Sequence, residues 1–241
     1  MPYRRLPNTD KARLRAIENA LSKHKVIPSH ELAFSYLTLL ELQSIYPTLS
    51  AANSKLNRAK ETQFNKSKSY AVIFRNAKLY VSHFIQVLNF AIARGEIKEE
   101  VRDFYGLKKN SPLLTKEEQL SKWGRKIIDG DAKRIASGGM PFYNPTIALV
   151  RAHFEQFETA YANRKTLQKQ TGDASGEMVN LRIKVDAIIT KLWNEIEAHF
   201  DHLPEEIKRT ESTKYGISYV YRPKERARLI AAANQRKISF E

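Results

Sequence analysis

Residues 68–94, KSYAVIFRNAKLYVSHFIQVLNFAIAR, decide the fold of this chain. Their apolar side chains recur at steps of four and three residues, a spacing that places them on one face of an α-helix. Gly95 follows directly as a candidate C-cap, because glycine adopts the left-handed backbone that often ends a helix. The stretch therefore predicts a long helix that buries one stripe, formed by Tyr70, Phe74, Ala77, Val81, Phe84, Leu88 and Ala91.

Three further stretches carry the same spacing and predict three more long helices. The first begins near Ser29 and ends near Phe64, and Pro47 inside it predicts a kink or a break because proline lacks the N–H that a helix needs. Polar residues 65–67 predict the turn that follows. The other two helices are expected from Asn144 to about Gly172 and from about Ser175 to His202. Glycine and proline are scarce, at nine each, so the pattern indicates an all-α fold of two long antiparallel hairpins with a four-helix-bundle-like core.

Shorter elements are expected around these hairpins. Thr9 and Asp10 can cap a first helix, and residues 115–118 form a capping-box pattern that predicts a helix to about Ala136. Pro204 opens a short helix to about Thr213, and Pro223 opens a last helix to about Lys237. Alternation over residues 217–221 is the one strand-like pattern in the chain.

The second part of the sequence resembles the first. When the chain is aligned on itself, Glu96-Ile97-Lys98 falls on Glu206-Ile207-Lys208, and Tyr105-Gly106 falls on Tyr215-Gly216. We therefore expect a single domain, 1–241, of two similar halves, approximately 1–110 and 111–241. Two unrelated hairpins of similar length are the alternative. A duplication makes physical sense because one hairpin cannot bury its own apolar seam, whereas two hairpins can.

The chain is strongly basic, with a formal charge of +15 and a pI of about 9.8. Residues 1–28 carry a net charge of +5 and residues 204–241 a net charge of +4. Arginine beside tyrosine can bind phosphates and stack on bases, so the basic ends are candidate nucleic-acid-binding surfaces. The alternative is that these side chains dock on the bundle with their stems over apolar surface. The candidate residues are Arg4, Arg5, Arg222, Lys224, Arg226 and Arg228.

Apolar residues surround the predicted helix between Leu32 and Leu49 on nearly all sides. A helix of this kind is either buried on most sides or covers a partner. This stretch favours a non-enzymatic interaction or scaffold protein that binds a protein partner or itself. The candidate interaction surface comprises Leu32, Phe34, Tyr36 and Leu39.

Motifs for catalysis or cofactor binding are missing from the sequence. There is no cysteine, no glycine-rich phosphate loop and no Gly-x-Ser-x-Gly, so we expect no cofactor and do not expect an enzyme. Glu195, His199 and His202 share one helix face at a spacing that suits zinc or iron, which leaves a metal-dependent enzyme as a further alternative. Solvated polar groups at a helix end are the simpler interpretation, so no metal is expected.

The first ten residues, MPYRRLPNTD, resemble the start of a group of uncharacterised, all-helical proteins from Bacteroidetes-type bacteria. This resemblance implies a bacterial, helical protein with no known activity and carries over no site residue. The sequence shows neither a signal peptide nor a run of about 18 uncharged apolar residues. We therefore expect a cytoplasmic location and no membrane partner.

Overall fold

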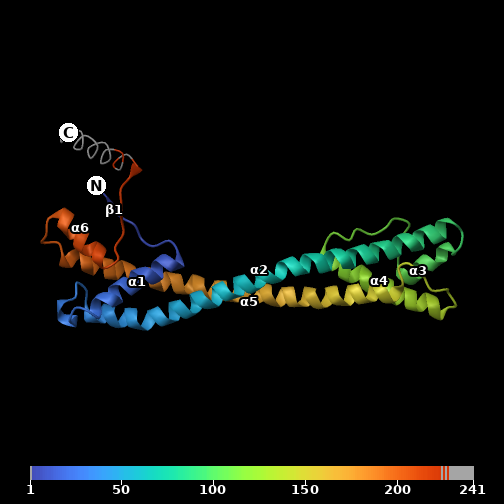
Figure 1. Ribbon diagram of the computed structural model, residues 1–241, viewed down its shortest axis with the longest axis horizontal. Coiled ribbons are helices and arrows are strands. Elements are labelled where there is room, and N and C mark those ends of the chain that lie inside the picture. Colours follow the sequence, from blue (N-terminus) through green and yellow to red (C-terminus); the bar gives the residue numbers. More distant parts are fainter. Residues whose placement is uncertain (1, 224, 226, 228–241) are drawn as a thin grey trace, which may run out of the picture. The chain divides into compact units, whose positions relative to one another are not determined.

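The computed structural model describes residues 2–223, 225 and 227, and it confirms the all-α class (Figure 1). Helices α1 to α6 account for most of the described residues. Within the described part of the chain, β structure is limited to one sheet of two short strands, β1 and β2. The last predicted helix, from Pro223 to about Lys237, lies mostly outside the described residues.

Two long helices replace the four that the sequence predicts. Helix α2 spans Tyr36–Ala93 over 58 residues, and α5 spans Ile147–His199 over 53 residues. The predicted turn at residues 65–67 and the predicted helix end near Gly172 are therefore wrong, because both places are helical. The polar side chains at these places are exposed to solvent, and the backbone remains helical. Gly172 costs about 1 kcal/mol relative to alanine in a helix interior, which the buried residues on either side of it outweigh.

Pro47 lies inside α2 and does not end it. Its side chain is exposed, as is that of Gln43, whose carbonyl loses its usual helical donor four residues later. Water can satisfy that carbonyl at the surface. The first long helix therefore begins at Tyr36 rather than near Ser29, after a separate 3₁₀ turn, η1, at Ser29–Glu31, and continues through the proline.

The chain forms two compact units, each with its own hydrophobic core. Unit 1 comprises Met1–Asn57 and Asp173–Glu241, as far as these are described, and unit 2 comprises Arg58–Gly172. The units cut across the two predicted halves, 1–110 and 111–241, because each long helix contributes one part to each unit.

Unit 1 packs α1, Asp10–His24, against the first part of α2 and the last part of α5. Thr9 caps α1 as predicted, its hydroxyl accepting a 3.1 Å hydrogen bond from the Ala12 N–H. The core between the three helices includes Ile17, Leu42, Leu49, Val185, Leu192 and Trp193, each at most 1% exposed.

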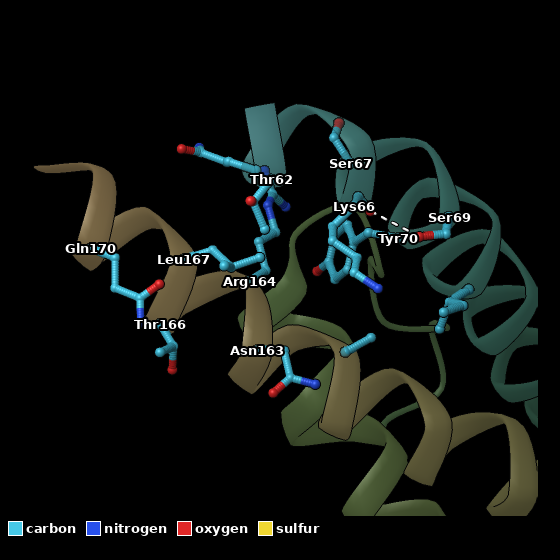
Figure 2. A pocket seen from close by; sticks show the side chains of 13 residues that line it. Thr62, Lys66, Ser67, Ser69, Tyr70, Asn163, Arg164, Thr166, Leu167 and Gln170 are labelled. Atoms are coloured by element: carbon cyan, nitrogen blue, oxygen red, sulfur yellow. Dashed lines mark hydrogen bonds between the residues drawn. The ribbon is translucent and has the colours of Figure 1, made fainter. Parts of the chain in front are cut away.

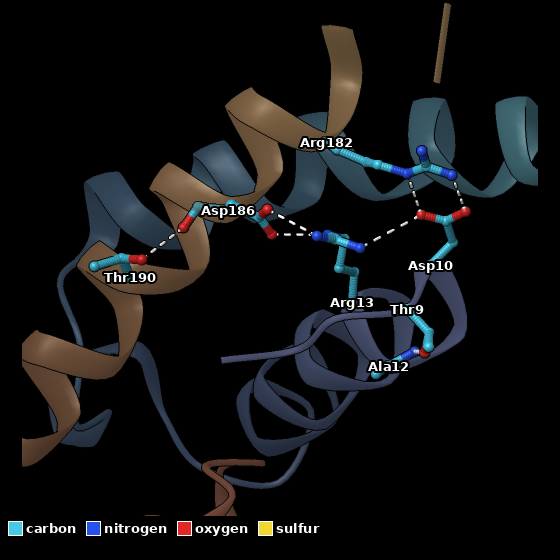
Figure 3. Close-up of polar contacts among 7 residues, drawn as sticks. All are labelled: Thr9, Asp10, Ala12, Arg13, Arg182, Asp186 and Thr190. Atoms are coloured by element: carbon cyan, nitrogen blue, oxygen red, sulfur yellow. Dashed lines mark hydrogen bonds and ion pairs between the residues drawn. The ribbon is translucent and has the colours of Figure 1, made fainter. Parts of the chain in front are cut away.

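Two arginine–carboxylate pairs join α1 to α5 in unit 1 (Figure 3). Arg13 donates two hydrogen bonds, of 2.7 and 2.8 Å, to Asp186. Arg182 donates two hydrogen bonds of 2.7 Å to Asp10 in the opposite direction. Paired donors on a planar guanidinium fix orientation as well as distance. These pairs therefore set the register of α1 along α5.

Unit 1 also contains one short helix and a pair of short strands. Helix α6 spans Glu205–Lys214, in agreement with the prediction. Strand β2, Tyr219–Val220, lies in the predicted strand-like segment and pairs antiparallel with β1, Tyr3–Arg4, with Tyr3 opposite Val220.

Unit 2 packs α4, Glu117–Ala136, against the last part of α2 and the first part of α5. Short elements η2, Glu99–Val101, and α3, Arg102–Tyr105, follow α2. Gln119 accepts hydrogen bonds from the N–H groups of Thr115 and Lys116, so it completes the start of α4 where a capping box was predicted.

A buried polar network ties α3 to α4 in unit 2. The Tyr105 hydroxyl donates a 2.9 Å hydrogen bond to Asp131, and the Arg134 guanidinium donates to both residues. All three side chains are at most 4% exposed. Burial and the neighbouring carboxylate raise the pKa of Tyr105, so its hydroxyl stays protonated and able to donate.

The two units contain the same four kinds of parts, although these parts follow one another in a different order along the chain. Each contains a leading helix, the first part of one long helix, the last part of the other, and a short helix that ends in a buried tyrosine and a glycine. These glycines, Gly106 and Gly216, both have positive φ, of 60° and 96°. Six buried positions of α2 in unit 2 match buried positions of α5 in unit 1 at one constant offset; they are 70, 77, 81, 84, 85 and 88 against 178, 185, 189, 192, 193 and 196.

A close helix contact in unit 2 predicts the effect of a single methyl group. A Cβ at Gly124 of α4 would lie 2.2 Å from a ring carbon of Phe154 on α5. Gly124→Ala should therefore lower the free energy of unfolding by about 1–3 kcal/mol through overpacking. Thermal unfolding followed by circular dichroism measures this change.

The matched control is Gly176→Ala, because nothing lies within 4 Å of a Cβ at that helical glycine. This change should raise stability by about 0.5–1 kcal/mol, since alanine loses less backbone entropy in a helix. Equal melting temperatures for Gly124→Ala and the wild type would contradict the contact between α4 and α5.

Candidate functional site

The positive charge of the chain is concentrated in unit 2. Residues 58–172 contain 21 basic and 11 acidic side chains, which leaves +10 of the total +15 in this unit. The basic ends that were selected from the sequence belong to unit 1, where acidic side chains elsewhere offset much of their charge. The strongest positive field is therefore expected around unit 2.

Within unit 2 the charge gathers on one stretch of each long helix. The basic segment, defined as residues 58–69 of α2 and 162–172 of α5, holds seven basic side chains and one acidic side chain. No residue of the basic segment is buried. Six of its basic side chains make no ion pair within the described part of the chain; they are Arg58, Lys60, Lys66, Lys68, Lys165 and Lys169.

A pocket of about 470 Å³ opens between the two helices of the basic segment and extends to neighbouring turns (Figure 2). Its apolar wall consists of Tyr70, Ile73 and Leu167. Hydroxyl, amide and cationic groups supply the remaining lining, from Thr62, Gln63, Lys66, Ser67, Ser69, Asn163, Arg164, Thr166 and Gln170, with Ala160 between them. The volume lies within the range of pockets that hold small molecules.

Arg164 and Tyr70 fix one side of this pocket. The Arg164 guanidinium carbon lies 4.6 Å from the centroid of the Tyr70 ring, and the guanidinium pairs with Glu117 at the start of α4. Tyr70 is 8% exposed, and its hydroxyl has no hydrogen-bond partner of normal geometry among the described residues. Burial raises the pKa of Tyr70, which the adjacent Arg164 partly opposes, so the phenol remains neutral at ordinary pH.

One aromatic side chain of the basic segment faces solvent. Phe64 is 65% exposed on α2, and the Lys68 ammonium lies 5.7 Å from its ring centroid. An exposed aromatic ring beside cations is a feature that stacks on bases in single-stranded nucleic-acid sites. The basic segment therefore combines charge, hydrogen-bonding groups and an exposed ring.

The terminal arginines selected from the sequence are not brought together as one free surface. Arg4 is bound to Glu197 at 2.8 Å and lies over the Trp193 ring, which is the docked arrangement. Tyr219 also donates to Glu197, and burial together with this carboxylate raises its pKa to about 12. Arg5 and Arg222 are exposed. Lys224, Arg226 and Arg228 lie outside the described residues.

Most of the candidate interaction surface is buried. Leu32, Phe34 and Leu39 are 6%, 5% and 1% exposed and belong to the core of unit 1. They are therefore unavailable to a partner in this structure. Tyr36 is 61% exposed, and two neighbours that were not selected from the sequence, Leu37 and Leu40, are 62% and 44% exposed. Within residues 32–49, the large apolar side chains that stay exposed are these three.

The candidate metal ligands have other partners. Glu195 accepts hydrogen bonds from the Ser35 N–H and the Thr38 hydroxyl, each at 2.8 Å, and so caps the start of α2. His199 lies edge-to-face on Phe200, and His202 contacts the His199 carbonyl. The described residues contain no group of three or more metal-binding side chains.

The basic segment was not found from the sequence because a turn was predicted at residues 65–67 and a helix end near Gly172. Charge was compared between the ends of the chain rather than between packed units. The signal was present in the sequence: seven basic residues stand against one acidic residue in two stretches that lack any buried apolar position.

Comparisons of the chain with protein-family models, curated proteins and solved structures give no significant match. The resemblance of the first ten residues to a bacterial helical family thus stays a prediction. Among the described residues, no helix is both long enough and apolar enough to cross a membrane.

The role of Glu195 as a cap for α2 is testable. Glu195→Ala would leave the Ser35 N–H and the fully buried Thr38 hydroxyl without their acceptor. Loss of this cap should lower the free energy of unfolding by about 1–3 kcal/mol. Chemical denaturation followed by circular dichroism measures it.

Glu155→Ala on the same helix is the matched control, because that exposed side chain makes no hydrogen bond or ion pair within the described chain. Its stability should stay within about 0.5 kcal/mol of the wild type. If both variants unfold at the same denaturant concentration as the wild type, Glu195 does not stabilise the start of α2.

Proposed function

We propose that this protein binds nucleic acid through the basic segment of unit 2. The observation that carries the proposal is a set of six cations on two adjacent helices that have no ion-pair partner among the described residues. One of them, Lys66, lines a pocket rich in hydrogen-bonding groups. Phosphates attract such cations strongly because binding releases condensed counterions. Helices hold the cations at defined spacings, which a flexible basic tail cannot do.

The geometry of the basic segment favours nucleic acid over an anionic membrane surface. An interfacial helix needs a wide apolar face that enters the lipid. Phe64 and Leu167 are the large apolar residues of the basic segment, and Leu167 lines the pocket. Hydroxyl and amide groups dominate the rest of the lining, and these groups suit sugars, phosphates and base edges.

Removing three cations tests this function. Lys60→Ala, Lys66→Ala and Lys68→Ala, combined in one variant, should weaken binding of labelled oligonucleotides and reduce the slope of log affinity against log salt by about 2, since each phosphate contact contributes about 0.7 to 0.9. Alanine keeps the helix because it has the highest helix propensity. Fluorescence anisotropy over a series of salt concentrations gives both quantities.

A charge-matched control separates the basic segment from the overall charge. Lys108→Ala, Lys109→Ala and Lys133→Ala remove three exposed cations of unit 2 that lie outside the basic segment, and should change the affinity much less. Equal weakening by both triple variants would reject the basic segment as the site. Binding to anionic vesicles without binding to oligonucleotides would assign the basic segment to a membrane surface instead.

Self-association is a second candidate function, favoured by the exposed Tyr36, Leu37 and Leu40 at the start of α2. Apolar residues that gather on the surface mark interfaces more often than scattered ones do. A scaffold protein that pairs through this group would combine self-association with nucleic-acid binding by the other unit.

Leu37→Asp with Leu40→Asp tests the second candidate. The double variant should shift the protein toward the monomer in sedimentation velocity experiments, because a desolvated carboxylate strongly opposes association. A conservative variant, Leu37→Met with Leu40→Met, should retain the wild-type distribution. A wild-type protein that is monomeric at every concentration tested contradicts self-association through this surface.

We also propose that the chain arose by internal duplication. The common set of parts in the two units supports this, as do the buried tyrosine and positive-φ glycine at the ends of α3 and α6. Buried positions of the long helices match at a slightly smaller offset than the Glu-Ile-Lys and Tyr-Gly motifs do. Ala77, for example, matches Val185 in burial, whereas Ala187, its partner at the offset of the motifs, is exposed. A duplication would therefore have been followed by a change of two residues in length between positions 88 and 96 of the first copy or between positions 196 and 206 of the second copy.

A further inference from the structure

The pocket in the basic segment narrows the class of nucleic acid that the protein would bind, on the condition that the proposed function holds. Its volume of about 470 Å³ is far smaller than a duplex and matches the small-molecule scale of a single nucleotide. Its walls come from both long helices of unit 2, so it is a concave site rather than a flat charged face (Figure 2).

We propose that the preferred ligand is single-stranded nucleic acid and that the pocket receives one unstacked nucleotide. Tyr70, Ile73 and Leu167 form an apolar wall against which a base can lie. Asn163 and Gln170 offer amide donors and acceptors, which are the groups that read the edge of an exposed base. The Lys66 ammonium at the pocket can meet the phosphate of the same nucleotide.

Duplexes cannot use these features without distortion. Paired bases are stacked with their edges in the grooves, and moving one base out of the stack costs a few kcal/mol. Single strands present unstacked bases at little cost, and proteins that bind them combine a basic groove with aromatic platforms. Tyr70 supplies the aromatic part of the pocket wall, whereas Phe64, exposed beside Lys68, is not one of the residues that line the pocket.

The alternative that the pocket serves only the packing of the two helices does not account for its lining. Tyr70 is more than nine-tenths buried at the pocket, yet its hydroxyl lacks a hydrogen-bond partner of normal geometry among the described residues. Buried polar groups normally find a hydrogen-bond partner. A ligand or ordered water that enters beside Arg164 would give the Tyr70 hydroxyl a hydrogen-bond partner of normal geometry.

The experiment compares a single-stranded RNA, a single-stranded DNA of the same sequence and the corresponding DNA duplex at one fixed salt concentration. Fluorescence anisotropy of the full-length protein should give a dissociation constant for single strands at least about tenfold below that of the duplex, which corresponds to one favourable base contact of about 1–3 kcal/mol. Similar affinity for all three ligands would overturn the inference. This result would leave the proposed nucleic-acid binding intact, because that proposal is tested separately by the lysine variants.

Two neutral variants connect this preference to the pocket. Asn163→Leu with Gln170→Leu removes the amides, and Thr62→Phe fills the space from α2; neither alters the charge. Each should lower single-strand affinity at least about threefold and leave duplex affinity unchanged. The control is Asn65→Leu with Gln168→Leu, which makes the same exchanges at exposed positions of α2 and α5 outside the pocket.

These variants distinguish the two proposals. Pocket variants that retain wild-type single-strand affinity, while circular dichroism shows the wild-type helix content, would overturn the pocket as the nucleotide site. Loss of affinity for single strands and duplex alike in the control variant would also contradict it, because the effect would then come from the surface rather than from the pocket.

Discussion

The structure depends on one constraint: helices as long as α2 and α5 are stable in a protein when their apolar stripes are covered. Propensity alone supports only short helices in water, so tertiary burial must supply most of the stability. Leu42, Leu49 and Leu56 of α2 meet this demand in unit 1, and Val81, Phe84 and Leu88 meet it in unit 2. Between these two seams the stripe stops, and residues 57–69 of α2 include no buried side chain.

The interruption in the stripe is also where the candidate site lies. Side chains that are not required for packing are free to be lysine, arginine, asparagine and glutamine, and the basic segment contains all four. The core of unit 2 holds its parts of α2 and α5 together, so the cations and the pocket lining are presented on regular backbone rather than on loops. Binding residues held on rigid elements are positioned more accurately than those on mobile ones.

Sequence patterns predicted the parts of the fold that depend on local chemistry. The seam of residues 70–91, the cap at Thr9 and the short helix after Pro204 were all found in the structure. The continuity of α2 and α5 could not be predicted in the same way. A polar run such as residues 65–67 is compatible with a turn or with an exposed helix, and the choice depends on the partner helix. The polar part of α5 around Gly172 presented the same choice.

The candidate site was less predictable than the fold. Counting charge along the sequence favoured the termini, but Arg4 is held by Glu197, and cations are concentrated in a unit that the sequence did not delimit. Leu32, Phe34 and Leu39 were selected for their apolar character, which cannot distinguish a core from an interface. Likewise, Glu195 has the chemistry of a metal ligand, but its neighbours in space, Ser35 and Thr38, make it a helix cap.

The order of the units along the chain bears on how the protein is made. Unit 2 is one continuous stretch, Arg58–Gly172, whereas unit 1 is divided between the beginning of the chain and its end. During synthesis, which proceeds from the N-terminus, domains generally fold as units once their residues are available. Unit 2 is therefore complete first. At that stage the part of the nascent chain that precedes Arg58 cannot complete its core, because its core partners Met178, Leu192 and Ile196 have not yet been synthesised. Its apolar side chains are the part of the newborn protein most in need of protection by a chaperone.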